Sequence, residues 1–273
     1  MSVRRLVTLL LVVLTLGLIL IPALRLRLRL TLGRIVACAL RLRAREMGVQ
    51  QDGITLVLAP HQDDEALGCG GLIARRRQAG HPVHVAFVTD GAASHAGHPT
   101  LTPADLAAWR ADEARSALRL LGIEASAIHF LRAPDGELER LPPAAAAALI
   151  VRLTALLDTI RPTEVFLPLQ ADGSSEHTAA FRFFSQALAA SSVRPRVCEF
   201  PVWARWNPLL LLRPLLQARR ITCCRFPDYA ALKQRAISAY RSQTEPTPPW
   251  TQPLLSRGFR DSFAAPEEFF FEF

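Results

Sequence analysis

The fold of this chain is decided by one stretch, Ile54-Thr-Leu-Val-Leu-Ala-Pro60-His61-Gln62-Asp63-Asp64-Glu65. Its apolar and β-branched first half predicts a buried strand over residues 54–59, and the chain then changes abruptly to one imidazole and three carboxylates. A helix is predicted to follow over residues 66–78. Ligands of α/β domains bind beyond the carboxyl ends of the strands, so this strand–turn–helix unit places polar groups where such domains use them.

The same alternation of strand-like and helix-like segments continues to about residue 240. Further strands are predicted over residues 83–89, 128–131, 165–169, 196–202 and 221–226. Further helices are predicted over residues 104–121, 143–160, 178–190 and 230–240. This order predicts an α/β fold, a mostly parallel sheet with helices on both faces. Residues 203–220 are expected to form a surface insertion near the membrane.

A membrane-spanning helix is predicted near the amino terminus. Residues 6–24 form a nineteen-residue apolar stretch without a charge, long enough at 1.5 Å per residue to cross a hydrocarbon core of ~30 Å. A cleaved signal peptide would have a shorter apolar region and a small-residue cleavage site, which Ile21-Pro-Ala-Leu24 does not provide. We therefore expect an uncleaved, single-pass anchor.

Charge predicts how this anchor is oriented. Two arginines precede the apolar stretch and seven follow it within residues 25–45. The positive-inside rule then places the following domain in the cytoplasm. The alternation of arginine and leucine is expected to be a stop-transfer flank, with a segment lying on anionic lipid as the alternative. The chain is accordingly divided into an anchor with an Arg-rich juxtamembrane segment, residues 1–47, and a catalytic domain, residues 48–273.

Composition argues against nucleic acid and nucleotides as partners. The net charge is +8, but residues 1–45 hold nine arginines and no acid, whereas the rest holds 23 basic and 24 acidic residues. The part of the chain after residue 45 is therefore nearly neutral, which does not support nucleic-acid binding. Gly68, Gly70 and Gly71 miss the Gly-x-Gly-x-x-Gly spacing, and the acids that start the helix would repel a phosphate, so no nucleotide cofactor is expected.

His61 and Asp64 are predicted to share one metal ion. They stand three residues apart, so one helical turn can aim both at the same point, while Asp63 between them points elsewhere. A third candidate, His177, ends the turn Leu169-Gln-Ala-Asp172-Gly-Ser-Ser-Glu176-His177 that follows another predicted strand. Two histidines and one carboxylate with an open fourth position are typical of catalytic zinc. Asp63, not itself a ligand, is then placed to act as a general base.

These motifs resemble one protein family. Pro60-His-Gln-Asp-Asp-Glu65 resembles the Pro-His-x-Asp-Asp-Glu signature of the LmbE-like, or PIG-L, family of metal-dependent N-acetylglucosaminyl deacetylases. Further matches run in order over about residues 54–243, namely Thr89-Asp-Gly91, Arg110-x-x-Glu113-Ala114, Leu121-Gly122, Pro134-Asp-Gly136, Arg161-Pro162, Lys233-x-x-Ala236 and Tyr240-x-Ser242-Gln243. The first motif is specific by itself, and the ensemble is more specific still.

The resemblance implies a Rossmann-like fold and a deacetylase that uses Zn²⁺ or another divalent metal. It implies that His61, Asp64 and His177 bind the metal and that Asp63 is the catalytic base. Its substrate would be an N-acetylated amino sugar whose hydroxyl groups contact Arg110 and Asp135. An anchored enzyme that faces the cytoplasm suits a lipid-linked form of such a sugar.

Four residues depart from the pattern of the family that the sequence resembles. Gln62 stands where proline is usual, and Tyr240 stands where many relatives have a histidine. In the third-ligand motif, commonly His-x-Asp-His, Ser174 replaces the first histidine and would face the substrate in its place. Glu176 replaces the aspartate and keeps a carboxylate that could orient His177.

The replaced histidine is credited in relatives with stabilising the oxyanion or protonating the amine. Losing one oxyanion donor costs about 10²–10³ in rate unless another group compensates, and Ser174, His95 and His98 are candidates. Two alternatives therefore remain open. The chain could hydrolyse the amide of a non-sugar conjugate, or it could be a weakly active or inactive metal-bearing protein that binds carbohydrate.

Overall fold

The computed structural model describes residues 27, 31–48 and 53–273. The predicted membrane span at residues 6–24 lies outside the described residues. Among those described, one helix, α4 (Pro143–Ile160), has the length and hydropathy of a membrane span. Its Leu149, Leu153 and Leu157 recur every four residues and are buried in the core, so this helix covers the sheet.

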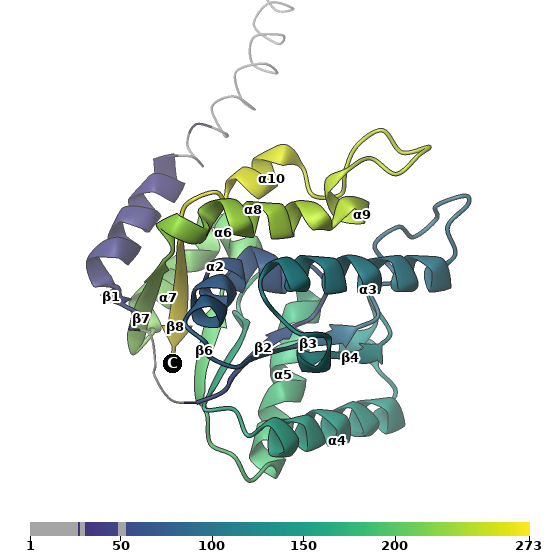
Figure 1. Cartoon of the computed structure of the whole chain (residues 1–273), viewed down its shortest axis with the longest axis horizontal. Coiled ribbons are helices and arrows are strands. Elements are labelled where there is room, and N and C mark those ends of the chain that lie inside the picture. The colour runs from purple at the N-terminus through teal and green to yellow at the C-terminus, as the bar shows by residue number, and fades with distance from the viewer. Residues whose placement is uncertain (1–26, 28–30, 49–52) are drawn as a thin grey trace, which may run out of the picture.

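A single sheet forms the centre of the described chain, with eight strands in the order β1-β7-β8-β6-β5-β2-β3-β4 (Figure 1). In chain order these strands are β1 (Arg45–Glu46), β2 (Thr55–Ala59), β3 (Val83–Thr89), β4 (Ile128–Ala133), β5 (Glu164–Pro168), β6 (Arg196–Phe200), β7 (Arg220–Arg225) and β8 (Glu267–Glu272). Neighbouring described strands are parallel except where β8 pairs with β6 and β7. The predicted parallel-dominated α/β sheet is confirmed.

Helices cover both faces of this sheet (Figure 1). One face is covered by α2 (Asp64–Gln78), α3 (Pro103–Leu120) and α8 (Ala230–Ala239), the other by α4 and α5 (Ser175–Ala190). Successive residues of β2 alternate between the two cores, Val57 and Ala59 on the first and Leu56 and Leu58 on the second. Because both faces are buried, β2 reads as an uninterrupted apolar run.

The glycines of α2 allow this helix to lie close to its neighbours. A Cβ atom added at Gly68 would come within 2.1 Å of the Phe200 ring, and one at Gly71 within 2.2 Å of the Phe226 ring. Neither contact is sterically tolerable. These glycines therefore serve close packing, which agrees with the absence of a dinucleotide spacing in the sequence.

The sequence did not predict β8, which lies between β6 and β7 and is antiparallel to both. Its Glu268 accepts hydrogen bonds from the backbone N–H groups of Gly71 and Leu72 and pairs with the buried Lys233 at 2.7 Å. The last strand thus holds α2, the helix that begins with the candidate ligands, against the sheet.

Residues 31–47, assigned from composition to the juxtamembrane segment, pack against the domain. They form a helix over residues 31–43 and the strand β1, which pairs with β7. Segment 203–220 folds as α6 (Trp203–Trp206), η3 (Pro208–Leu211) and α7 (Leu212–Gln217) before it enters β7. Its Leu211 shares a small core with Val36 and Leu40 of the helix over residues 31–43.

The strand order contains a topological switch beside β2. From β2 the chain proceeds to β3 and β4 on one side, then returns to β5 and β6 on the other. The connections that leave β2 and β5 therefore diverge and open a crevice at the carboxyl ends of these two strands. The two motifs predicted to supply metal ligands follow β2 and β5 directly.

Candidate metal centre and active site

The turn after β2 places His61 and Asp64 side by side. Asp64 Oδ2 accepts a hydrogen bond from the backbone N–H of His61 at 3.0 Å and lies 3.2 Å from His61 Nδ1. Asp63 between them has φ 141°, a conformation that is strained for an L-residue. Its carboxylate lies 3.6 Å from Arg110 Nη2. Neighbouring residues of one turn thus present two separate polar groups to the crevice.

The turn after β5 fixes His177 in a buried position. The Nδ1 atom of His177 lies 2.7 Å from Asp172 Oδ2, and both side chains are completely buried. Asp172 also accepts hydrogen bonds from the backbone N–H groups of Val202, Trp203 and Ala204. Because the Asp172 carboxylate only accepts, it fixes the proton of His177 on Nδ1 and leaves a lone pair on Nε2 when the ring is neutral.

His61, Asp64 and His177 converge on one point. One ligand atom from each lies within 4.8 Å of the others. His177 Nε2 is buried without a hydrogen-bond partner and lies 3.4 Å from Asp64 Oδ2. A buried, unpaired imidazole nitrogen that faces a carboxylate is the arrangement a divalent metal would complete. These three residues therefore fit a metal with two nitrogen ligands and one oxygen ligand.

Protonation of the two histidines supports the same interpretation. Burial alone would lower the pKa of His177, but the charge of Asp64 and the contact with Asp172 raise it to about 9. Burial likewise opposes a charge on His61, yet hydrogen bonds to Asp135, Asp64 and Glu176 raise its pKa well above the usual range. The cluster contains more carboxylates than imidazoles, and their negative charge favours the protonated form of both histidines. It is a site that stabilises cations.

The carboxylates of Asp135 and Glu176 both lie near the Nε2 atom of His61. Its Nε2 atom is 3.2 Å from Asp135 Oδ1 and 3.5 Å from Glu176 Oε2. Glu176 also accepts hydrogen bonds from the backbone N–H groups of Gly136 and Leu138. The prediction that Glu176 orients His177 is wrong, because Asp172 occupies that position and Glu176 faces the other histidine. These two carboxylates can instead form a second oxygen-rich group with His61.

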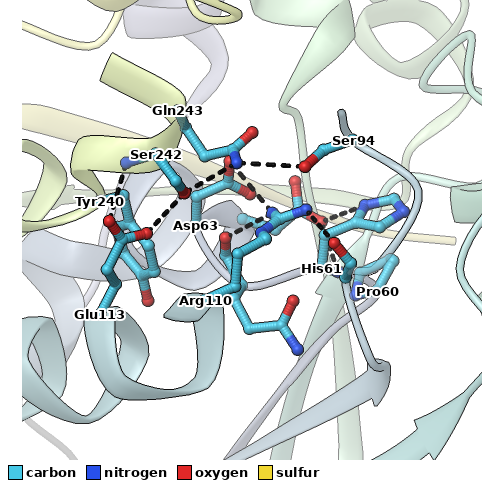
Figure 2. Close-up of polar contacts among 12 residues, drawn as sticks. Pro60, His61, Asp63, Ser94, Arg110, Glu113, Tyr240, Ser242 and Gln243 are labelled. Atoms are coloured by element: carbon cyan, nitrogen blue, oxygen red, sulfur yellow. Dashed lines mark hydrogen bonds and ion pairs between the residues drawn. The ribbon is translucent and has the colours of Figure 1, made fainter. Parts of the chain in front are cut away.

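Asp63 and Arg110 form a separate pair at the crevice (Figure 2). Burial raises the pKa of Asp63 to about 7, although the positive charge of Arg110 works against this rise. Arg110 is 2% exposed and also donates to the backbone carbonyls of Gln62 at 2.7 Å and Gly91 at 3.3 Å. A carboxylate whose pKa lies near neutral pH can both accept and return a proton, as a general base requires.

Most of the candidate residues line a cleft of 620 Å³, whereas His177 and Glu176 are not part of its lining. We call the polar lining residues, which include Asp63, Arg110, Asp135 and Ser174, the polar wall. The apolar lining residues are called the apolar wall, namely Leu67, Val202, Trp203, Leu254, Leu255 and Phe259. Trp203 and Leu254 are each 41% exposed. The cleft thus offers a large apolar surface next to its charged residues.

A chain of hydrogen bonds supports the polar wall of the cleft. Figure 2 shows it running from Glu113 through Ser242 and Gln243 to Ser94. Ser242 donates both its backbone N–H and its hydroxyl to the Glu113 carboxylate. Ser94 and Gln243 line the cleft, so this network fixes two neutral polar groups that face the cleft.

The residues that depart from the family pattern lie in different places. Gln62 is buried and donates to the backbone carbonyl of Thr89 at 2.9 Å. Tyr240 is buried and directs its hydroxyl to Glu65, away from the cleft lining. Ser174 lines the cleft and caps α5 by accepting from the backbone N–H of His177. Of these departures, Ser174 alone faces the substrate space.

His95 and His98 do not take the place of the replaced histidine. His95 stacks on Trp250 and lies 3.1 Å from Thr247 Oγ1, and the Nε2 atom of His98 lies 2.9 Å from the carbonyl oxygen of Pro248. Neither lines the cleft. Both hold the loop over residues 246–253 in position.

Sequence reasoning missed Asp172, Ser94 and Gln243 as functional residues. For Asp172 a signal was present, since it is a carboxylate in the same polar turn as His177, five residues earlier. Gln243 belonged to the family match Tyr240-x-Ser242-Gln243 but was given no role, and for Ser94 no local pattern existed. They meet only because their segments, far apart in the chain, fold against each other.

Comparison with known structures places this geometry among related folds. Diacetylchitobiose deacetylase from Pyrococcus horikoshii is 24% identical over 72% of this chain and 74% of its own, with a TM-score of 0.53. The conserved protein TT1542 from Thermus thermophilus is 28% identical over 69% of this chain and 79% of its own, with a TM-score of 0.53.

One similar structure has a different reaction. GalB, a 4-carboxy-2-hydroxymuconate hydratase from Pseudomonas putida KT2440, is 18% identical over 70% of this chain and 80% of its own, with a TM-score of 0.56. The fold alone therefore does not fix the chemistry. The sequence itself matches the family described as PIG-L, GlcNAc-PI de-N-acetylase, over residues 56–188, the part that contains all the candidate ligands. The chain carries a domain of the PIG-L, or LmbE-like, family.

Proposed function

We propose that this protein hydrolyses the N-acetyl group of an N-acetylglucosamine-type glycan or glycoconjugate, releasing acetate and a free amine. One observation carries the proposal, the unpaired Nε2 atom of the buried His177 facing Asp64, with His61 close by. Asp63 stands apart from this cluster and is free to move a proton. A related fold carries the name of a chitobiose deacetylase, which supports the same substrate class.

The positions of the side chains support the following course of reaction. A divalent ion, zinc in our proposal, held by His61, Asp64 and His177 would polarise the acetamide carbonyl and lower the pKa of the attacking water. Asp63 takes a proton from water as the water oxygen bonds to the carbonyl carbon. The C–N bond then breaks, and Asp63 returns the proton to the amine nitrogen.

Three further groups assist these steps. Arg110 holds the Asp63 carboxylate in place and keeps its pKa from rising further. Asp172 holds the ring of His177 at its other nitrogen. Ser174, whose hydroxyl accepts from the backbone N–H of His177, keeps its own proton available to donate toward the carbonyl oxygen. The hydroxyl groups of the sugar would then meet Arg110, Ser94 and Gln243 along the polar wall.

The apolar wall supports a substrate with a lipid or other apolar portion. Trp203, Leu254 and Phe259 line the cleft together with the catalytic groups, so an acyl or isoprenoid portion next to the sugar would be removed from water there. The uncharged stretch over residues 6–24 supports membrane anchoring of the full chain, and the arginines after it support a cytoplasmic domain.

The test is release of acetate by the zinc-loaded full chain. Substrates would be an alkyl N-acetylglucosaminide, free N-acetylglucosamine, and a non-sugar N-acetyl amide with the same alkyl chain. We expect the alkyl glycoside to be the best substrate and Asp63→Asn to reduce turnover by about 10²–10⁴ while metal content stays unchanged. Asp112→Asn, on the exposed face of α3, is the matched control.

The outcomes separate the proposal from its alternatives. Preferential hydrolysis of the non-sugar amide would assign the chain to a different amide substrate. Glycoside binding without acetate release in either the wild type or Asp63→Asn would indicate a carbohydrate-binding protein. A metal content below one equivalent that Asp64→Asn leaves unchanged would disprove the metal site itself.

A further inference from the structure

The helix over residues 31–43 has two faces of opposite character. Val36 and Leu40 are buried against η3, α7 and β8. On the outward side Ile35 is 60% exposed, Leu42 is 84% exposed, and Cys38 between them is exposed. In Figure 1 this helix forms the outer edge of the molecule, beside β1 and β7. An outward apolar stripe on a helix at the edge of a soluble fold requires an explanation.

The segment that packs beside this helix also exposes apolar side chains. Leu209 of η3 is 58% exposed, and Leu212 and Leu216 of α7 are 38% and 77% exposed. The inward residues of the same two elements, Leu211 and Leu215, contact the core formed with Val36 and Leu40. The helix over residues 31–43 and the neighbouring segment of η3 and α7 therefore each bury one apolar face and expose other apolar side chains to solvent.

The two segments that carry these leucines are rich in arginine. Residues 31–45 and 200–227 contain nine arginines and no aspartate or glutamate. Four of these arginines and Ile221 line a hollow of 320 Å³, namely Arg43, Arg45, Arg219 and Arg220. Among the described residues, Arg34, Arg43, Arg45 and Arg219 make no ion pair with a carboxylate. Three of the other arginines do have an acidic partner, since Arg41 pairs with Glu267, Arg225 pairs with Glu46 at 2.8 Å and Arg220 lies 3.8 Å from Glu272.

We propose that residues 31–45 and 209–220 form a docking face for a bilayer that contains anionic phospholipid. The face consists of Ile35, Leu42, Leu209, Leu212 and Leu216 together with Arg34, Arg43, Arg45, Arg219 and Arg220. Exposed leucines flanked by arginines are the composition of surfaces that lie in the headgroup region, where the apolar groups enter the acyl boundary and the cations meet phosphates.

This proposal is independent of both the anchor and the catalytic reaction. The face belongs to the folded part of the chain, at the edge of the sheet that carries β1 and β7. A tether alone holds the domain near a membrane in any orientation, whereas a docking face fixes one orientation. A second copy of the chain is disfavoured as the occupant, because two such faces would bring unpaired arginines together.

The native Cys38 provides the probe, since it lies on the docking face and the other four cysteines are buried. The full chain, labelled there with a polarity-sensitive thiol dye, is placed in nanodiscs of phosphatidylcholine alone or with about one third phosphatidylserine. Nitroxide-bearing lipids report contact by quenching the dye. Any anchor holds the protein equally to both discs, so the difference between them measures the docking face. Labelled Cys38→Ser protein gives the background.

We expect quenching at least severalfold stronger in the anionic discs, with a blue shift of the emission. Raising the salt to about 1 M, where the Debye length falls from ~10 Å to ~3 Å, should remove the difference. The triple substitution Arg43→Gln, Arg45→Gln, Arg219→Gln should abolish it. The triple substitution Arg119→Gln, Arg152→Gln, Arg235→Gln removes the same charge from exposed positions elsewhere and should leave it intact.

Leu42→Ser, with Val151→Ser on the exposed side of α4 as its control, tests the apolar part of the face. Circular dichroism confirms that each variant is folded. Equal quenching in the two kinds of disc, or equal loss in both arginine triples, would overturn the proposal. So would displacement of the dye from the anionic disc by a short oligonucleotide, because the face would then be a site for nucleic acid.

Discussion

The two turns that supply the candidate metal ligands are built in opposite ways. The turn after β2 is partly open, with 19% of the His61 side chain exposed and a strained Asp63 beside it. The turn after β5 is shielded from solvent, because His177 and Asp172 are fully buried and Asp172 accepts hydrogen bonds from three backbone N–H groups. The first turn is suited to moving protons and meeting substrate, and the second to holding one ligand in a fixed position.

In metal-free protein, this contrast predicts that His177→Ala lowers the free energy of unfolding more than His61→Ala does. This is the largest effect that we expect. Removal of His177 leaves the buried Asp172 carboxylate without its charged partner, a change that costs about 3–5 kcal/mol in comparable buried pairs. Removal of the partly exposed His61 should cost about 1 kcal/mol. Chemical denaturation in the presence of a chelator measures both values, and equal losses would show that the two turns do not differ as described.

Zinc affinity should respond differently to the loss of Asp172, which contacts His177, and to the loss of Glu176, which contacts His61. Asp172→Asn weakens the hold on His177 Nδ1, and we expect zinc affinity to fall about 10–100-fold. Glu176→Gln keeps an oxygen acceptor for the backbone N–H groups of Gly136 and Leu138 and should change affinity less. Competition with a fluorescent zinc chelator provides the measurement. A larger effect of Glu176→Gln would restore the interpretation derived from sequence.

The pH dependence of turnover should depend on Arg110. Burial raises the pKa of Asp63 to about 7 and Arg110 opposes the rise, so Arg110→Met should raise that pKa further. Since a base acts when deprotonated, the rising limb of kcat/KM against pH should move upward by about one unit or more. Arg110→Lys keeps the charge and should move it less. An unchanged limb in Arg110→Met would exclude Asp63 as the titrating group.

A pH-dependent change in stability is predicted for Glu199, which accepts a hydrogen bond from the backbone N–H of Gln170 in the buried turn after β5. Burial raises its pKa to about 7 from an ordinary value of 4.5. The stability that the protonated form contributes is therefore present below pH 4.5 and is lost as pH rises through 7. Compared with Glu199→Gln, the wild type should lose about 3 kcal/mol over this range. Parallel urea titrations would show it, and a constant difference would contradict it.

The sequence predicted most elements of the fold because they are local. The strand over residues 83–89 and the helix over 143–160 are found with the same bounds, and the helix after His61 begins two residues before its predicted start. Strand β8 was missed because its position between β6 and β7 depends on long-range pairing. Its Phe269, Phe270 and Phe271 were the available signal, since aromatic residues favour strands.

The same limit applied to the candidate site. The motif after β2 contains its own ligands, so sequence spacing was enough to select them. The partners of Asp172 come from residues 202–204, and the partner of Glu65 is Tyr240, so neither contact can be read from a short window. The candidate metal ligands and the candidate base were accessible to sequence reasoning, whereas residues whose contacts come from distant segments, such as Asp172, Ser94 and Gln243, were not.

The place of β8 has a consequence for synthesis. Strand β8 is synthesised after β6 and β7 and yet lies between them. Until β8 is made, β6 and β7 each have one edge whose backbone N–H and C=O groups lack a strand partner. Until residues 267–272 arrive, Lys233 also lacks Glu268, and the helix that begins at Asp64 lacks one of its clamps. A nascent chain at that stage is prone to aggregation, and removal of residues 267–272 would loosen the helix that begins with the candidate metal ligand Asp64.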